Sequence, residues 1–258
     1  MTTALPKFIN NMSFVQLNLF IFSLFVVFIA LGLFVSEKVW PSEKRIFYNN
    51  TILGIMQVVG VVFAIIVGTI IVSVWTNFDN TKKITIAEAG TVGDLYRNVK
   101  NLKGLEPLRP LLLDYGHHVI ETEWPMMRKG EKPTSGWNYL FRMQNILNQQ
   151  KEPRDHVQSI LTNLFDNRRL RIASTDPYLP SVIYFLLFFL SVFILFFSFL
   201  VGTKNIFSHA LICACLALPL CLTITTVAAM DYPYSTQIFI EPNDMKTVLH
   251  NLTHLSDT

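Results

Sequence analysis

The chain has 258 residues, a net charge of +3 and only 15% charged residues, whereas 51% of its residues are hydrophobic. Proteins that bind nucleic acid usually carry a basic stripe with interleaved aromatic residues, and this sequence has no such stripe. We therefore expect no nucleic-acid partner, and the hydrophobic share points to the lipid bilayer instead.

Four long apolar runs, in two pairs, dominate the sequence. Each exceeds the roughly 20 residues that a helix needs to cross a bilayer, and none contains Asp, Glu, Lys or Arg. The first run is longer than the apolar core of a secretory signal peptide, so we expect it to be retained. The runs are Phe14–Val35, Ile52–Trp75, Pro180–Val201 and Phe207–Met230.

These runs predict an all-α membrane protein with four transmembrane helices in two hairpins and a helical cytoplasmic domain between spans 2 and 3. We expect an N-terminal hairpin over residues 1–75 and a C-terminal hairpin over residues 180–230. The helical domain would occupy residues 76–179, and a tail would follow over residues 231–258.

The second run has a face of small residues headed by a glutamine. Small residues let neighbouring helices approach closely. They would also leave room along a pore that the glutamine wets at one end. Both interpretations stay open for this set, which is Gln57, Gly60, Ala64 and Gly68.

A second set of bulky side chains recurs every four residues along the same run. In a channel such a stripe would form a hydrophobic constriction that gates by dewetting. Its members are Phe63, Val67, Ile71 and Trp75.

The region between the second and third runs reads as helical. An apolar stripe over residues 84–102 has helical spacing and predicts that the second span continues outward as an amphipathic helix. Further helices are predicted over 108–124, closed before Pro125, and over 137–149 and 153–173. In the tail we expect a strand-like stretch over 237–240 and a short helix over 242–254.

The sequence has no motif for catalysis, such as a phosphate-binding glycine loop, HExxH or GxSxG, so we expect neither an enzyme nor a cofactor. We also expect no metal site. All three cysteines (Cys213, Cys215 and Cys221) lie in the fourth run, where they would pack as small apolar residues. His250 and His254 share a helix face, and zinc chelation there is the minor alternative to solvated histidines.

Basic residues are distributed unevenly between the two sides of the membrane. Of 21 Lys and Arg, the two short loops between paired spans hold Lys38, Lys44, Arg45 and Lys204. The positive-inside rule therefore places both termini and the middle domain in the cytoplasm.

Several short motifs follow one another between about Gly54 and Val248, and in this order they resemble the bestrophin-like family of bacterial membrane proteins, most of them functionally uncharacterised. Where the family usually has a glycine shortly after the last motif, this chain has Ser235 and Thr236. The motifs are Glu88-Ala89, Leu95-Tyr96, Leu111–Tyr115, Asp166 with Arg168, Arg169 and Arg171, and Asp231-Tyr232-Pro233-Tyr234.

The more distant likeness to true bestrophins implies a homo-oligomeric ring of five subunits in a bacterial inner membrane. The second span would line an ion pore, and the cytoplasmic helices would prolong it. Either set of span-2 residues would then be a candidate lining.

Five charged residues are candidates for a vestibule or a membrane interface. Arg168, Arg169 and Arg171 would attract anions or, as we favour, anchor the chain to anionic headgroups. Glu88 and Asp231, together with Asp94, would equally produce acidic rings. Alternatively, Asp231 would cap backbone amides, which we favour over binding a cation.

Our leading hypothesis is a homo-oligomeric channel for inorganic ions. The chief alternative is a non-conducting membrane scaffold or sensor whose cytoplasmic helices bind a partner. A channel needs a continuous wettable path, whereas bulky apolar contacts would close the axis of a scaffold.

Overall fold

The computed structural model describes residues 12–100, 102–150, 154–234 and 238–254, which form two compact helical units. The membrane unit comprises residues 12–76 and 178–231, and the polar unit comprises residues 77–177 and 232–254. No strand occurs among the described residues. The strand-like stretch predicted over 237–240 is therefore wrong for residues 238–240, which are irregular. Gln237, Ser235 and Thr236 lie outside the described residues.

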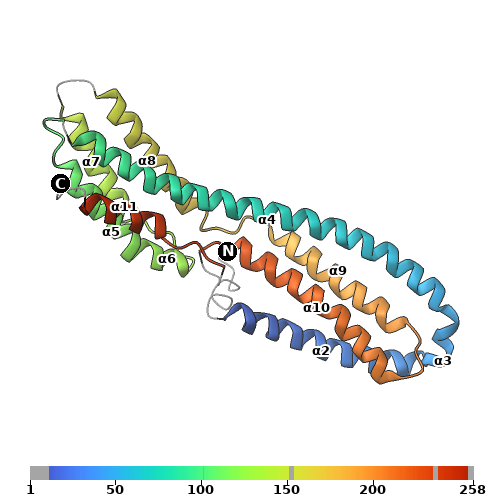
Figure 1. The fold of residues 1–258 in the computed structure, drawn as a ribbon. Helices are drawn as coiled ribbons and strands as arrows, with labels where there is room; N and C mark the ends of the chain where they lie inside the picture. Colours follow the sequence, from blue (N-terminus) through green and yellow to red (C-terminus); the bar gives the residue numbers. More distant parts are fainter. Residues whose placement is uncertain (1–11, 101, 151–153, 235–237, 255–258) are drawn as a thin grey trace. The chain divides into compact units, whose positions relative to one another are not determined.

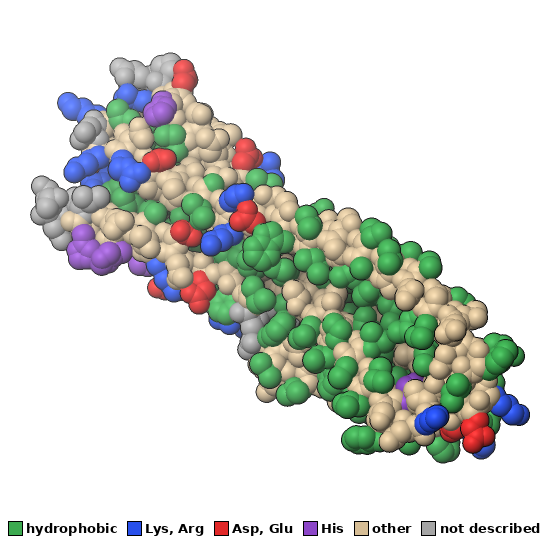
Figure 2. Space-filling view, turned by 45° about the vertical axis from the view of Figure 1, so that its right-hand side comes forward, with side chains coloured by type: hydrophobic (Ala, Val, Ile, Leu, Met, Phe, Trp, Pro, Cys, Tyr) green, Lys and Arg blue, Asp and Glu red, His purple; other side chains and the backbone are tan. Residues whose placement is uncertain are grey.

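The membrane unit contains the long apolar helices. Their length and composition suit membrane crossing in four segments, as the sequence predicts. Hydrophobic side chains cover most of the visible surface of this unit, and charged side chains gather at its loop end (Figure 2). The elements are α2 (Phe14–Val39), α3 (Ser42–Arg45), the 3₁₀ helix η1 (Ile46–Tyr48), the first half of α4 (Asn49–Val99), α9 (Ser181–Leu200) and α10 (Ile206–Asp231) (Figure 1).

Helices α2, α9 and α10 pack together around an apolar core. Cys213 and Cys221 are buried in this core, and all three cysteines are free thiols. Polar contacts also join these helices; in one of them the Thr225 hydroxyl of α10 donates to Asn18 Oδ1 of α2 at 2.7 Å. The core residues are Phe25, Ile29, Leu33, Ile194, Leu195, Phe199, Cys213, Ala217, Leu220 and Cys221.

The two short loops of the membrane unit are locked together. Asn49 Nδ2 donates to the Gly202 carbonyl at 2.9 Å, and Asn49 Oδ1 accepts from the Gly202 amide at 2.8 Å. A Cβ at position 202 would lie only 2.7 Å from the Ser42 carbonyl oxygen, so glycine permits this close approach. The buried Arg45 guanidinium donates to the Phe199 carbonyl and pairs with Glu37.

The polar unit packs shorter helices against the second half of α4. Its core includes Leu95, Leu112, Met127, Leu140 and Met143, all fully buried. The elements are α5 (Leu108–His118), the π-helix η2 (Val119–Glu123), α6 (Trp124–Arg128), α7 (Trp137–Asn148), α8 (Asp155–Ala173) and α11 (Asn243–His254).

The helix predicted to close before Pro125 continues to Arg128. Pro125 lies in the first turn of α6, where its missing N–H and fixed φ are tolerated. The wider π-helix η2 ends at Glu123, two residues before this proline. The change from α-helix to π-helix and back thus allows the helical backbone to continue beyond Pro125.

Candidate pore face and buried ion-pair network

One face of α4 packs into the membrane unit. Ile52, Val67, Ile70 and Val74 are buried along it. Partly buried side chains lie between them on the same side, and all of these contact the apolar clusters of the unit. They are Met56, Val59, Phe63, Ile66 and Ile71.

The opposite face of α4 is exposed in the single chain and contains four of the candidate pore residues. Gln57, Ala64, Gly68 and Trp75 are all exposed, Trp75 by 62%. Their spacing of seven, four and seven residues keeps them on one side of a helix with about 3.6 residues per turn. A Cβ built at Gly68 would meet no atom within 4 Å. The small residue there is therefore not a close helix contact within the chain.

The bulky candidates at four-residue spacing do not stay on one side of the helix. Each four-residue step exceeds one turn by about 40°, so the three steps from Phe63 to Trp75 add up to about 120°. Phe63, Val67 and Ile71 consequently pack against other helices, whereas Trp75 is exposed. The expectation of one constriction formed by all four side chains has to be corrected, because they do not share a face.

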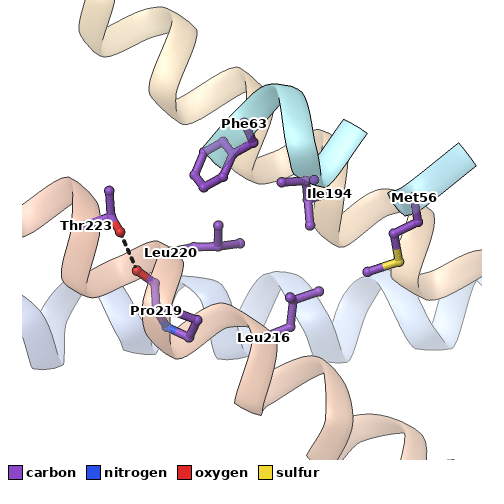
Figure 3. Close-up of a pocket in the computed structure, with 8 residues that line it drawn as sticks. Met56, Phe63, Ile194, Leu216, Pro219, Leu220 and Thr223 are labelled. Carbon is purple, nitrogen blue, oxygen red and sulfur yellow. Dashed lines mark hydrogen bonds between the residues drawn. The ribbon is translucent and has the colours of Figure 1, made fainter. Parts of the chain in front are cut away.

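Gly60 borders a half-open apolar cavity of about 260 Å³ (Figure 3). Met56 and Phe63 of α4, Ile194 of α9 and Leu216 of α10 contribute to its walls. The polar atoms at its margin are already paired, since the Thr223 hydroxyl donates to the Pro219 carbonyl at 2.8 Å, shown as a dashed line in Figure 3. Gly60 therefore makes room inside the membrane unit and does not lie fully on the exposed face.

Gln57 is the polar residue of the exposed face. It lies about 12 Å along α4 from Asn49, at 1.5 Å per residue. Among the described residues its amide has no hydrogen-bond partner. An unpaired amide in hydrocarbon costs several kcal/mol. The side chain thus calls for water or a polar group from outside the chain.

A buried network of two acids and two arginines holds the polar unit together. Arg171 of α8 donates from Nε to Glu88 Oε2 at 2.5 Å and from Nη2 to Glu123 Oε2 at 2.7 Å. Arg168 Nη1 donates to the same oxygen of Glu123 at 2.5 Å. The Tyr115 hydroxyl donates to Glu88. The two positive and two negative charges balance, which is the condition under which buried ions are tolerated.

Aromatic rings and backbone groups complete the surroundings of this network. Arg168 lies over the ring of Trp137 at 4.8 Å, and Arg171 lies over Trp124 at 5.3 Å. The Gly136 amide donates to Glu123 Oε1 at 3.2 Å. These contacts fix α8 against η2, α6 and the start of α7.

The network shifts the protonation equilibria of its members. Burial raises the pKa of Glu123, but the hydrogen bond from Arg168 and the charge of Arg171 outweigh it, so the pKa lies below its ordinary value. Burial, reinforced by the negative charge of Glu88, raises the pKa of Tyr115 well above its ordinary value. At neutral pH the acid is therefore charged and the phenol is neutral.

The expected interface role of the arginines needs correction for two of the three. Arg168 and Arg171 have no exposed surface, and Glu88 is 1% exposed, so none of them is available to a headgroup or a vestibule in this fold. Arg169 points to solvent with 70% of its side chain exposed, and it pairs with Asp166 at 3.2 Å. Arg169 therefore remains the candidate for anion or headgroup attraction.

Asp231 at the end of α10 is fully buried, and both of its carboxylate oxygens accept hydrogen bonds. Its Oδ1 accepts from the backbone amides of Tyr178 and Leu179, both at 2.9 Å. Its Oδ2 accepts from the Tyr184 hydroxyl at 2.7 Å. The contacts are those of a carboxylate that caps the turn before α9, the favoured of the two expected roles.

Sequence reasoning missed Glu123, Tyr115 and Arg45 as members of buried clusters. A usable signal for the arginine partners of Glu123 was present in α8. Its apolar stripe Val157, Leu161 and Leu164 continues at the same three- and four-residue spacing to Arg168 and Arg171, and all five are buried. An arginine in register with an apolar stripe predicts a buried counter-ion.

Comparison with known proteins agrees with this architecture. The family model described as the bestrophin-like domain matches residues 23–245. The chain belongs to the bestrophin-like family. A search of curated protein sequences found no match.

Solved structures share the fold of this bestrophin-like chain. A single-substitution variant of a bacterial bestrophin homolog from Klebsiella pneumoniae has 12% identity and a TM-score of 0.69, with 93% of this chain and 99% of that chain covered. The homolog solved by zinc phasing has 12% identity and a TM-score of 0.67, with 93% of this chain and 98% of that chain covered. A variant described only as a membrane protein has 11% identity and a TM-score of 0.70, with 93% of this chain and 99% of that chain covered. At these identities the likeness establishes the fold.

Proposed function

We propose that this bestrophin-like protein is a homo-oligomeric ion channel whose pore follows the symmetry axis and is lined by the exposed face of α4. That face would present Gln57, Ala64, Gly68 and Trp75 to the axis. The supporting observation is Gln57, an amide without a partner among the described residues, in a span whose Thr69 and Ser73 hydroxyls donate to carbonyls of their own helix. A water-filled axis supplies the hydrogen bonds that hydrocarbon does not.

Symmetric assembly is part of the proposal, because four spans without a charged residue make a poor pore on their own. One span from each subunit around an axis creates a continuous path. The family membership supports a pentamer in a bacterial inner membrane. The distribution of Lys and Arg supports cytoplasmic termini and a cytoplasmic polar unit that prolongs the path.

The same face of α4 also carries features of the alternative function. Val61, Ile65 and Val72 are each at least 60% exposed near the proposed axis. If these side chains met their copies around the axis, the path would close and the assembly would be a non-conducting scaffold. Ion flux distinguishes the two functions.

The decisive experiment is a pair of aromatic-to-alanine substitutions on one helix. The purified full-length chain is reconstituted in vesicles and planar bilayers under a KCl gradient. We expect Trp75→Ala to raise ion flux several-fold, because a bulky apolar side chain on the lining face restricts wetting. Phe63→Ala removes a similar ring from the packed face and should leave flux unchanged.

The Phe63→Ala variant also reports on folding, since it enlarges the cavity of Figure 3 and should lower the apparent Tm. Silence of the intact wild-type oligomer across voltage, pH and calcium would reject the channel in favour of the scaffold. Equal flux increases in both variants would reject the assignment of the lining face.

A further inference from the structure

A polar cavity of about 280 Å³ lies at the loop end of the membrane unit. Residues of both short loops and of the adjoining helix ends line it. Glu37 and Arg45 come from the first loop region, Lys204 from the second, and His209 from the first turn of α10. The proposed pore face does not include any of these residues, so the cavity requires a separate explanation.

The lining has one positive charge without a counter-ion. Glu37 accepts hydrogen bonds from the Ser42 amide and hydroxyl, both at 3.1 Å, and forms an ion pair with Arg45. These contacts neutralise the acid. Lys204 is exposed, and its ammonium group has no ion-pair partner among the described residues. The remaining charge of the cavity therefore favours an anion.

Arg45 adds a donor that the fold leaves unused. Its side chain is 1% exposed, and its Nη1 group donates to the Phe199 carbonyl and, at 3.2 Å, to the Ser36 hydroxyl. Its Nε has no hydrogen-bond acceptor among the described residues. A buried N–H of a guanidinium is costly to leave unpaired, so an acceptor from a bound ligand would satisfy it.

Aromatic residues place this cavity at the level of lipid headgroups. Trp40 and Tyr48 lie 5.4 Å apart between ring centroids, and Phe47 contacts Tyr48 at 5.1 Å. Phe47 is 84% exposed. Aromatic side chains next to the end of a membrane span mark the bilayer–water interface, where lipid phosphates lie.

We propose that this cavity binds a phosphate oxyanion, with the exposed Lys204 as one donor and the unpaired Nε–H of Arg45, a residue of the lining, as a second donor that the ligand reaches on entering. A phosphate has several strong acceptor oxygens, which suits two separated cationic donors. His209 is already engaged with the Ser198 carbonyl at 2.8 Å and is not needed for binding. The phosphate of a phospholipid headgroup and free phosphate are the two sources of this group. The proposal does not depend on channel activity.

Native mass spectrometry of the purified full-length oligomer tests the proposal with two lipids. Phosphatidylglycerol has a phosphate, whereas a galactosyl diacylglycerol has none. We expect the wild type to retain phosphatidylglycerol about tenfold more than the galactolipid, and Lys204→Gln to remove most of that preference. Lys38→Gln is the matched control, because Lys38 is an exposed lysine in the same loop region that does not line the cavity.

Competition with inorganic phosphate separates the two sources. Phosphatidylglycerol that stays bound in millimolar phosphate identifies the lipid headgroup as the ligand. Displacement of the lipid, together with a phosphate-dependent rise in Tm that Lys204→Gln abolishes, identifies free phosphate. Equal retention of both lipids by the wild type, or equal losses in Lys204→Gln and Lys38→Gln, would overturn the proposal.

Discussion

The absence of a side chain at Gly136 creates the space for the buried charges of the polar unit. A Cβ built there would overlap the Glu123 carboxylate and lie 2.6 Å from Arg168 Nη1. Both neighbours are held by several hydrogen bonds, so neither can move aside without losing one. The glycine is thus required by packing, at a φ that any residue could adopt.

We expect Gly136→Ala to lower the free energy of unfolding by about 2–4 kcal/mol, through overpacking and loss of the Glu123–Arg168 contact. Gly90→Ala is the control, because Gly90 lies within α4 with nothing within 4 Å of a Cβ. That substitution should be neutral or slightly stabilising. Thermal unfolding of both variants in detergent measures the difference, and equal Tm values would show that the contact does not constrain the fold.

At the scale of elements, α8 is held to η2 through ions, so its docking depends on pH. The pKa of Glu123 lies below 4.5, its ordinary value, in the folded chain. A group with a depressed folded pKa contributes its full stabilisation above the ordinary pKa and loses it as pH falls through the folded value. The ion-pair contribution is therefore complete above about pH 4.5 and disappears below it.

We expect the apparent Tm of the wild type to fall steeply as the pH drops below 4.5. In Glu123→Gln the apparent Tm should depend less on pH over the same acidic range. The same variant should be less stable at pH 7 by about 3–5 kcal/mol, because it leaves Arg168 without its buried counter-ion. Glu121→Gln is the control, since the side chain of Glu121 is 74% exposed. If the Tm of Glu123→Gln and that of the wild type fell equally below pH 4.5, Glu123 would not be the group responsible for the acid sensitivity.

Apolar periodicity predicted most elements correctly because it depends on neighbours in the sequence. The spans, the extension of α4 and helices α7 and α8 follow from it, whereas α11 was predicted from Pro242 at its start. The passage through Pro125 did not, because a π-turn leaves no mark in the spacing of apolar residues. Burial of Arg168 was missed because its partner Glu123 comes from another element, 45 positions earlier in the chain.

The candidate pore face was predicted only in part, for a geometrical reason. Both sets of span-2 residues have spacings of three or four, and a series of four-residue steps rotates around the helix. Gln57 and Trp75 therefore share a face although they came from different sets. Burial along α4 resolves this, because it identifies the side that the chain itself covers.

At the scale of the whole molecule, the uncovered face of α4 is the surface through which copies of the chain would meet in the proposed oligomer. Gly68 contributes no contact within one chain, so a larger side chain there should leave the fold of the subunit intact. On a shared axis, one substitution appears once per subunit and its effect is multiplied. A substitution at Gly68 should therefore change the properties of the assembly without changing the stability of the subunit.

We expect Gly68→Leu to reduce ion flux at least about tenfold without lowering the Tm, because a ring of leucines would fill and dry the axis. Ala30→Leu is the matched control, an exposed small residue of α2 changed in the same way. Flux measurements and the mass of the purified oligomer check this expectation. Unchanged flux in Gly68→Leu from an intact, conducting oligomer would contradict it.

The paired hydrogen bonds between Asn49 and Gly202 make the loop end sensitive to chemical ageing. Hydrolytic deamidation of Asn49 would replace its donating nitrogen with a carboxylate oxygen. That oxygen would then lie 2.9 Å from the Gly202 carbonyl oxygen, at the distance of the lost hydrogen bond. Two acceptors repel each other, so the loops would separate at the point where the phosphate cavity is lined. Stored preparations that gain one mass unit at this asparagine should therefore lose bound lipid before they lose helical structure.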